Sequence, residues 1–449
     1  MSKHPIQLSD HFTYPRLLQF VLPCIGTMLF TSIYGIVDGL CVSNFVGKTA
    51  FAAVNLIMPL PQLLATVGFM LGTGGSAIVG ITLGEGDQQK ADRYFTMFLL
   101  AAAVIVSVLA VLGVLFLEPV ALLLGAKGEL LDYALRYGRI LMFSLPTFAL
   151  QNMFQSFFVT AEKPHLGFCF TLGAGCTNMV LDLLLVGVWG WGVEGAAIAT
   201  FISQLVGGVL PVLYFLDRNN SSRLHLCPTG FHGRVLLDAC INGSSELMTN
   251  LSMSLVNILY NFQLLRLIGE DGVAAFGVIM YASFLFVAVF VGYAFGSSPI
   301  VSFHYGARNL KEVHNLYSKS LRLIGVVAVT LTGASMAIIP HVARFFVGYD
   351  AALLALTSHA FRLYAISFLI LGFNIYASSF FTALGDGVTS ALISFLRTLV
   401  FQVAAVLILP ALLGTDGIWL AVTAAELAAL GVSTGMFIAK DKAFHYRTP

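Results

Sequence analysis

Charge is the scarcest property of this sequence. Only 10% of its 449 residues are Asp, Glu, Lys or Arg, whereas a soluble globular domain carries about 25%, and the mean hydropathy is +0.89. Polar stretches are short, and none leaves room for an extramembrane domain. The formal net charge of +1 excludes the strongly basic surface of nucleic-acid-binding proteins. The sequence therefore predicts an integral membrane protein, with the lipid bilayer and no nucleic acid as its partner.

Cysteine spacing typical of a metal site is also absent. Four of the six cysteines (Cys24, Cys41, Cys169 and Cys176) fall in apolar segments, where we expect them to fill the core without forming disulfides. A small-residue cleavage site is missing as well. The polar start, residues 1–16, runs directly into an apolar segment, so we expect the first span to be retained.

Long apolar segments, in contrast, are abundant. Runs of roughly 20 residues, enough to cross a bilayer as a helix, recur along the whole chain. They predict membrane-spanning helices near residues 17–40, 51–83, 95–117, 136–160, 166–189, 193–216, 235–266, 273–303, 321–341, 359–383, 388–412 and 417–438. The predicted fold class is an all-α integral membrane protein with twelve transmembrane helices.

The distribution of Lys and Arg predicts the orientation. If both termini lie on one side of the membrane, that side carries 15 of these residues, the other carries 7, and Arg397 lies within a span. Positive residues accumulate in cytoplasmic loops. We therefore expect a multi-pass protein of the plasma (inner) membrane with both termini in the cytoplasm.

The sequence contains the same unit twice. With an offset of 222 residues and no gap, residues 47–90 and 269–312 are identical at 12 of 44 positions. Each segment is a glycine-laced apolar helix that leads into a short charged loop. Gly84 and Gly306 are expected to end these helices as C-caps.

Two copies of six helices predict two pseudo-symmetric lobes. An even number of helices lets both copies enter the membrane from the same side, so an axis along the membrane normal relates them, with a central cavity between them. The predicted units are an N-lobe at 1–216, a cytoplasmic linker at 217–234 and a C-lobe at 235–449.

Polar residues inside the N-lobe spans mark a candidate ion site. An Asp or Glu at the centre of a spanning helix costs about 2.5–3.5 kcal/mol on insertion scales, so it faces protein or water. Asp38 follows Tyr34 by one turn in helix 1. Asp182 follows Asn178 by one turn in helix 5. Helices 4 and 6 add further polar side chains: Gln151, Asn152 and Thr200.

Two carboxylates among amide, hydroxyl and phenol oxygens suit a proton or a hard cation such as sodium. Burial favours the protonated form of a carboxyl group, and a second carboxylate nearby favours it further. Exposure to water or a bound cation reverses this preference, so the pair could load and unload a proton. Alternatively, Asp38 and Asp182 are structural caps or hydrogen-bond acceptors.

The C-lobe does not repeat this cluster. At the corresponding offsets, Tyr260 stands in place of Asp38 and Ala405 in place of Asp182. Helices 7, 10, 11 and 12 carry other polar residues, which are candidates for lining the substrate cavity: Glu246, Asn374, Arg397 and Glu426. Arg397 and a glutamate could form a buried structural pair. Alternatively, Glu246 or Glu426 could face the cavity and attract a cationic substrate.

These residues carry a resemblance to a known family. Over essentially its whole length the chain resembles MATE (multidrug and toxic compound extrusion) transporters of the MepA-like subgroup. The motifs that carry it are Tyr34-x-x-x-Asp38, Asn178-x-x-x-Asp182, the repeated stretches 74–84 and 296–306, and Gly192-Val193-Glu194-Gly195-Ala196-Ala197 at the start of helix 6.

The resemblance implies two six-helix lobes that export cationic or amphipathic drugs, driven by inward flow of protons or sodium. In archaeal and bacterial members the N-lobe ion site uses an Asp of helix 1, an Asn and an Asp of helix 5 and a Thr of helix 6. The matching residues here are Asp38, Asn178, Asp182 and Thr200. Polar helix 4 positions line the family's cavity, which implies Gln151 or Asn152. Some members use an acidic residue in helix 10, where this chain has Asn374.

Other function classes fit less well. Gly47-Lys48-Thr49 resembles the tail of a phosphate-binding loop, but Val42 occupies the position of its leading glycine. The acidic loops at 84–87 and 349–350 resemble an intramembrane protease pair, yet they fall on opposite sides of the membrane, so we expect no enzyme. A flippase for lipid-linked oligosaccharides is the alternative, although such a cavity is more often basic. We predict a monomeric antiporter that exports drug-like cations in exchange for protons or sodium, without a cofactor.

Overall fold

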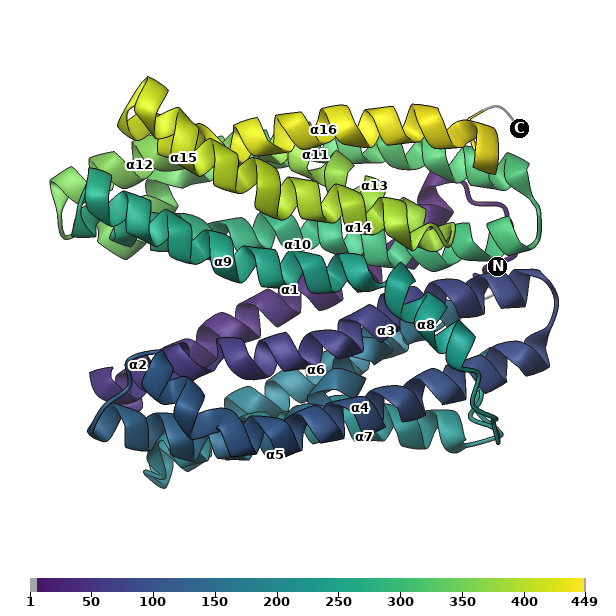
Figure 1. The fold of residues 1–449 in the computed structure, drawn as a ribbon, viewed down its shortest axis with the longest axis horizontal. Coiled ribbons are helices and arrows are strands. Elements are labelled where there is room, and N and C mark those ends of the chain that lie inside the picture. The colour runs from purple at the N-terminus through teal and green to yellow at the C-terminus, as the bar shows by residue number, and fades with distance from the viewer. Residues whose placement is uncertain (1–5, 448–449) are drawn as a thin grey trace.

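The computed structural model describes residues 6–447, apart from the side chains of residues 36, 39, 40, 42–44 and 48. All regular elements in this range are helical (Figure 1). In chain order they are α1 (Tyr14–Phe45), α2 (Lys48–Ile57), α3 (Pro59–Gly84), α4 (Gln88–Leu123), α5 (Glu129–Thr160), α6 (Pro164–Leu181), η1 (Asp182–Val188), α7 (Gly192–Leu216), α8 (Gly233–Asn242), α9 (Ser244–Leu267), α10 (Glu270–Gly306), α11 (Leu310–Val347), α12 (Ala351–Ala365), α13 (Phe368–Ala383), α14 (Gly387–Phe395), η2 (Leu396–Val400), α15 (Phe401–Leu413) and α16 (Thr415–Phe444).

These elements join into the twelve predicted transmembrane helices. Several are interrupted: α2 and α3 meet before Pro59, which cannot donate a backbone hydrogen bond, and α12 and α13 form one span bent by 46°. In the described part of the chain, nine helical stretches are long and apolar enough to cross a membrane, or ten with the bent pair. α5 and the α8–α9 pair complete the twelve. Charged ends, including Glu129 and Arg136, make α5 more polar than the others.

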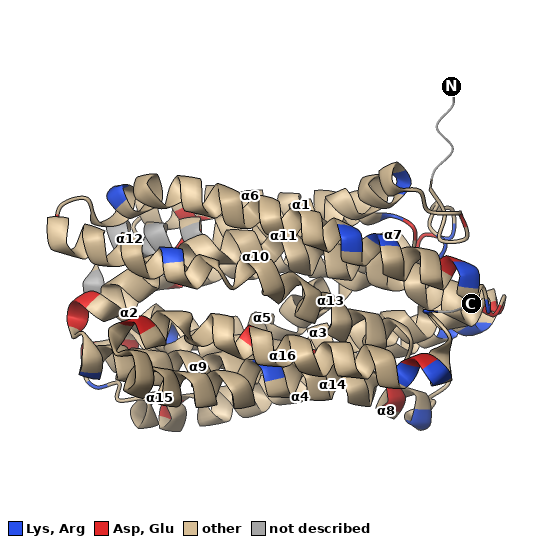
Figure 2. Ribbon diagram, turned by 90° about the horizontal axis from the view of Figure 1, so that it is seen from above, with Lys and Arg blue, Asp and Glu red and all other residues tan. Residues whose placement is uncertain are grey.

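The helices form two bundles that lie side by side (Figure 1). α1 to α7 make up the N-lobe and α8 to α16 the C-lobe, while the exact lobe boundaries stay a prediction. Both chain ends lie at the same end of the molecule, here called the terminal end (Figure 1). In Figure 2, Lys, Arg, Asp and Glu gather mostly at the two ends, and the long sides of the helices carry few charges. The sides are strongly apolar: Val104 and Val326, in the middle of α4 and α11, are 64% and 66% exposed, as a lipid-facing surface requires.

The repeated glycine stretches bring the lobes together near the terminal end. A Cβ atom on Gly84 of α3 would lie 2.0 Å from the carbonyl oxygen of Phe303 in α10. A Cβ atom on Gly306 of α10 would lie 2.0 Å from the carbonyl oxygen of Ile81 in α3. Because both pairs are related by the 222-residue offset, the two contacts are reciprocal, as across a two-fold axis. Only glycine permits so close a crossing.

This contact corrects the role predicted for the two glycines. α3 and α10 do end at Gly84 and Gly306, but neither residue is a left-handed C-cap. The left-handed conformation occurs two residues later, at Gly86 (φ 88°) and Arg308 (φ 56°). Gly84 and Gly306 serve packing between the lobes instead.

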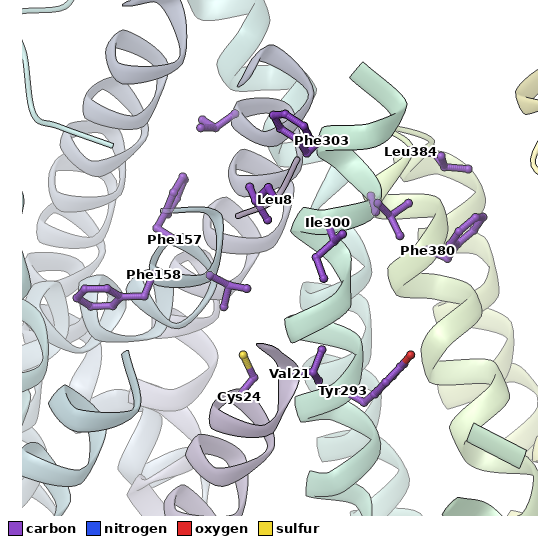
Figure 3. Packing of buried hydrophobic residues seen from close by; sticks show 14 of the residues in the cluster. Leu8, Val21, Cys24, Phe157, Phe158, Tyr293, Ile300, Phe303, Phe380 and Leu384 are labelled. Carbon is purple, nitrogen blue, oxygen red and sulfur yellow. The ribbon is translucent and has the colours of Figure 1, made fainter. Parts of the chain in front are cut away.

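Apolar packing continues across the lobes at this end. One buried cluster combines Phe157 and Phe158 of α5 with Ile300 and Phe303 of α10, and Leu8 lies among them (Figure 3). The core therefore does not stop at the boundary between the lobes near the terminal end.

The six cysteines are free thiols. Cys24 and Cys41 are buried, as expected, but Cys169 and Cys176 of α6 are exposed. Their predicted role in core filling is therefore wrong.

Candidate functional site

The N-lobe contains a cavity of about 600 Å³. Asn250 of α9 and Tyr281 of α10 also line it, so the cavity extends to the C-lobe. Five predicted residues from four different helices face it: Tyr34, Asp38, Asn152, Asn178 and Thr200. Their convergence on one cavity agrees with the sequence-based placement of these side chains.

Asp38 and Asp182 form a buried pair of acids. Asp38 is 9% exposed and Asp182 is fully buried behind it. The two carboxyl groups are neighbours in the same buried site, close enough to interact with each other. Asp182 is also the first residue of the π-helical segment η1. Such a segment interrupts regular helix geometry and is frequent at functional sites.

No cation neutralises this pair in the described part of the chain. Among the residues that the structure describes, eight ion pairs occur, and neither aspartate takes part in one of them. Oδ1 of Asp38 and both carboxyl oxygens of Asp182 receive no hydrogen bond from an amide or hydroxyl of the described residues. A buried acid without a counterion or donor is stable only when it is protonated or binds a cation. The structural-cap alternative finds no support in this geometry.

Neighbouring polar groups complete the N-lobe site. Asn178 Nδ2 donates to Thr200 Oγ1 at 3.5 Å, a long hydrogen bond that joins α6 to α7. The Tyr137 hydroxyl is buried close to both aspartates. Sequence reasoning missed Tyr137 because an aromatic residue in an apolar helix is usually read as core.

Gln151 does not line this cavity. Its side chain packs against Gly207 of α7, where a Cβ atom would lie 2.6 Å from the Gln151 amide carbon. The next residue, Asn152, does face the cavity. One residue along a helix turns a side chain by about 100°, so Gln151 packs towards α7 while Asn152 faces the cavity.

The C-lobe has a second, smaller cavity of about 210 Å³. Glu246, Arg397 and Glu426 line it, together with the aromatic residues Tyr260 and Tyr364. The sequence predicted the three charged residues. It did not predict the neutral polar residues that also face this space: Thr249, Asn257, Thr398 and Gln402.

Arg397 and Glu426 form the buried pair that was predicted as one alternative. Arg397 Nε donates to Glu426 Oε1 at 2.9 Å, and the two side chains are 11% and 1% exposed. Asn374 Nδ2 donates to Glu426 Oε2 at 2.7 Å, and Ser433 donates to Asn374 Oδ1 at 2.9 Å. Asn374 is therefore a fully buried support behind Glu426, and the interpretation of Asn374 as a cavity residue is wrong.

Glu246 is in a different situation. It lines the C-lobe cavity and also a small space between the lobes that contains Thr73, Ser156 and Ser298. No salt bridge of Glu246 occurs among the described residues, although Arg397 lies across the same cavity. Glu246 is thus the C-lobe acid that is free to meet a ligand.

Comparison with known proteins agrees with this architecture. The family model described as MatE matches the chain twice, at residues 23–184 and 247–408. The chain belongs to the MatE family. Its members are transporters and not enzymes. The two matches confirm that each half of this MatE protein is one copy of the same unit.

Individual relatives are distant but cover nearly the whole chain. The multidrug export protein MepA of Staphylococcus saprophyticus is 21% identical over 434 residues, which are 96% of this chain and 94% of the relative. MepA of Staphylococcus aureus strain NCTC 8325 is also 21% identical, over 431 residues. Both agree with the MepA-like resemblance of the sequence motifs.

Solved structures share the fold. A crystal structure of MATE in complex with MaL6 superposes with a TM-score of 0.90 at 22% identity, covering 96% of both chains. An outward-facing conformation of a multidrug resistance MATE family transporter of the MOP superfamily has a TM-score of 0.89, also at 22% identity and with 96% of both chains covered. This MatE protein is a multi-pass membrane protein with the two-lobed fold.

Proposed function

We propose that this MatE protein is a secondary antiporter that exports cationic or amphipathic small molecules in exchange for protons or sodium. The observation that carries the proposal is the Asp38–Asp182 pair, two neighbouring buried acids without a cation partner among the described residues. Such a pair binds a first proton or cation more tightly than a second one. It releases this ion or binds it again when the exposure of the two acids to water changes. The relatives named multidrug export protein support the substrate class.

The closeness of the two acids favours the proton as the coupling ion. Two neighbouring buried carboxylates repel each other, and protonation of one of them removes this repulsion. A sodium ion would have to lie between the two carboxyl groups and would need further oxygen ligands. Asn178 and Thr200 are the candidates for these ligands. Occupancy of the pair would shift α1, which carries Asp38 and packs on both lobes.

The proposal includes the orientation. With both termini in the cytoplasm of a plasma membrane, the terminal end is the cytoplasmic end, and the N-lobe cavity is reached from outside. A single chain contains both cavities, so a monomer suffices for transport. A flippase for lipid-linked oligosaccharides is the weaker alternative, because no Lys or Arg is among the described residues that line the N-lobe cavity.

The test is uptake of a fluorescent cation, ethidium, into everted membrane vesicles. Asp38→Asn and Asp182→Asn should each reduce uptake to the background of vesicles without the protein, because a neutral amide cannot release a proton. The thermal stability of both purified variants should stay close to that of the wild type, because the lost carboxylate has no ion-pair partner among the described residues. Glu118→Gln, which changes an exposed acid of α4, is the matched control and should transport normally.

The same vesicles identify the coupling ion. Collapse of the pH gradient alone should abolish uptake if protons are exchanged, and collapse of the sodium gradient alone should then have no effect. Wild-type uptake in both Asp variants would contradict the proposed coupling site.

A further inference from the structure

The segment before α1 crosses from one lobe to the other. We call residues 6–13 the strap. Its C-terminal half is bound to the first turns of α11 in the C-lobe: Phe12 N donates to Glu312 Oε1 at 2.9 Å, and Lys319 Nζ donates to Phe12 O at 2.7 Å. His11 Nδ1 lies 2.7 Å from Glu312 Oε2. α11 thus satisfies both backbone groups of Phe12.

The N-terminal half of the strap is bound to the N-lobe. Leu8 N donates to Glu162 Oε1 at 2.9 Å, and Glu162 lies in the loop between α5 and α6. Arg223 of the linker donates to the same oxygen at 2.7 Å. The Arg223 guanidinium also lies over the Phe303 ring of the C-lobe, 4.8 Å from its centre. Glu162 therefore joins the strap, the linker and, through Arg223, the C-lobe.

Apolar burial anchors the strap between these polar contacts. Leu8 and Phe12 are both fully buried. Leu8 lies near Phe303 at the junction of the lobes (Figure 3). The Phe12 ring meets the imidazole of His304 edge-on, with 6.4 Å between ring centres. Phe303 and His304 belong to the last turns of α10, the same turns that cross α3 at Gly84.

The linker repeats this arrangement in the opposite direction. His225 N donates to Asp92 at 3.0 Å and Cys227 N donates to Thr96 at 3.1 Å, both in the first turns of α4. The linker then enters α8 of the C-lobe. Each lobe's first helix is thus preceded by a segment that is docked on the other lobe.

We propose that the strap is a latch that holds the two lobes together at the terminal end and must release before that end can open. A movement of the lobes apart at α3 and α10 would pull Glu162 and Glu312 away from each other, and the strap, bound to both, would have to leave one of them. The inference does not depend on which ion or substrate is transported.

Hydrogen–deuterium exchange of the full-length protein in lipid nanodiscs tests the latch. Glu162→Gln and Glu312→Gln each weaken a charge-assisted hydrogen bond to the strap, and Phe12→Ala removes its apolar anchor without changing either acid. A hydrogen bond to a charged group contributes enough to change an opening equilibrium roughly tenfold. We expect roughly tenfold faster exchange of the backbone amides at residues 80–86 and 302–308 in all three variants.

Asp386→Asn is the matched control. Asp386 follows α13 as Glu162 follows α5, but it binds Lys440 at 2.8 Å and Thr389, both within the C-lobe. Burial alone would raise the pKa of Asp386, yet hydrogen bonds from Lys440 and Thr389 lower it below its ordinary value, so its carboxylate is charged at neutral pH. This variant should exchange faster only near the start of α14.

The proposal would be overturned by variants in which the backbone amides of the strap exchange freely while those at residues 80–86 and 302–308 exchange at the wild-type rate. Should Phe12→Ala speed exchange throughout the molecule, the milder Leu8→Ala takes its place. The latch then requires that Leu8→Ala speeds exchange at the same two segments and leaves the middle of α4 protected. Any other pattern counts against it.

Discussion

At the scale of single residues, Asp38 and Asp182 of the N-lobe and Glu426 of the C-lobe have opposite surroundings. The N-lobe leaves Asp38 and Asp182 without a counterion among the described residues. The C-lobe surrounds Glu426 with Arg397 and Asn374. A carboxylate with a fixed cationic partner has no reason to exchange a proton, whereas an unpartnered one does. The lobes thus share a fold and differ in chemistry.

The Arg397–Glu426 pair leads to a stability prediction. Glu426→Gln should lower the free energy of unfolding by about 3–5 kcal/mol, because it leaves the Arg397 guanidinium buried without a counterion. Thermal unfolding of the purified protein measures this. Ser433→Ala, which removes only the outer hydrogen bond to Asn374, should cost about 1 kcal/mol. The double variant Arg397→Met/Glu426→Gln removes both charges and should be more stable than Glu426→Gln alone. Equal stability of the two variants would contradict this explanation.

Much of the N-lobe site could be predicted at this scale. The cost of charge in a membrane singles out Asp38 and Asp182, and helical spacing adds Tyr34 and Asn178. The position of Asn374 was predicted incorrectly, because the sequence alone does not distinguish a residue that lines a cavity from one that is buried behind the lining. Partners far apart in sequence, such as Asn374 and Ser433, become visible only in three dimensions.

At the scale of elements, the lengths of the apolar runs predict that the helices exist, but they do not predict the local geometry within each helix. The π-helical segments η1 and η2 lie in the fifth helix of each lobe and carry Asp182 and Arg397. Nothing in residue periodicity distinguishes them from α-helix. Likewise, the repeat identifies Gly84 and Gly306, but their positions in the sequence predict only a role at the helix ends. The reciprocal crossing of α3 and α10 required knowledge of which helices meet.

The crossing of α3 and α10 predicts non-additive substitutions. Gly84→Ala and Gly306→Ala each place a Cβ atom 2.0 Å from a backbone oxygen of the opposite lobe, so each should destabilise the closed terminal end by about 1–3 kcal/mol. Once one substitution has separated the helices, the second meets less resistance. The double variant should therefore cost clearly less than the sum.

Thermal unfolding of the two single variants and the double variant measures this coupling. Gly86→Ala is the control, because its Cβ would meet open space and only the left-handed backbone (φ 88°) is strained, at about 1–2 kcal/mol. Strictly additive effects of Gly84→Ala and Gly306→Ala would mean that the two positions do not share one contact.

At the scale of the whole molecule, two copies of one unit are held together by exchanged segments. The strap belongs to the N-lobe sequence and docks on α11, while the linker docks on α4 and leads into the C-lobe. α1 and α3 both pack against α10. Most of what joins the lobes is therefore packing and hydrogen bonding, and the covalent linker contributes only one connection.

A divided chain should consequently reassemble. Residues 1–218 and 219–449, expressed as two polypeptides, break the chain at an exposed turn of the linker and leave every helix intact. Each half has six spans, so both insert in the same orientation. The halves should purify together through a tag on one of them and retain ethidium uptake in everted vesicles.

Gly84→Val with Gly306→Val should abolish this association, because the added side chains block the crossing of α3 and α10. Halves that purify separately without these substitutions would show that the linker, and not the interface, unites the lobes.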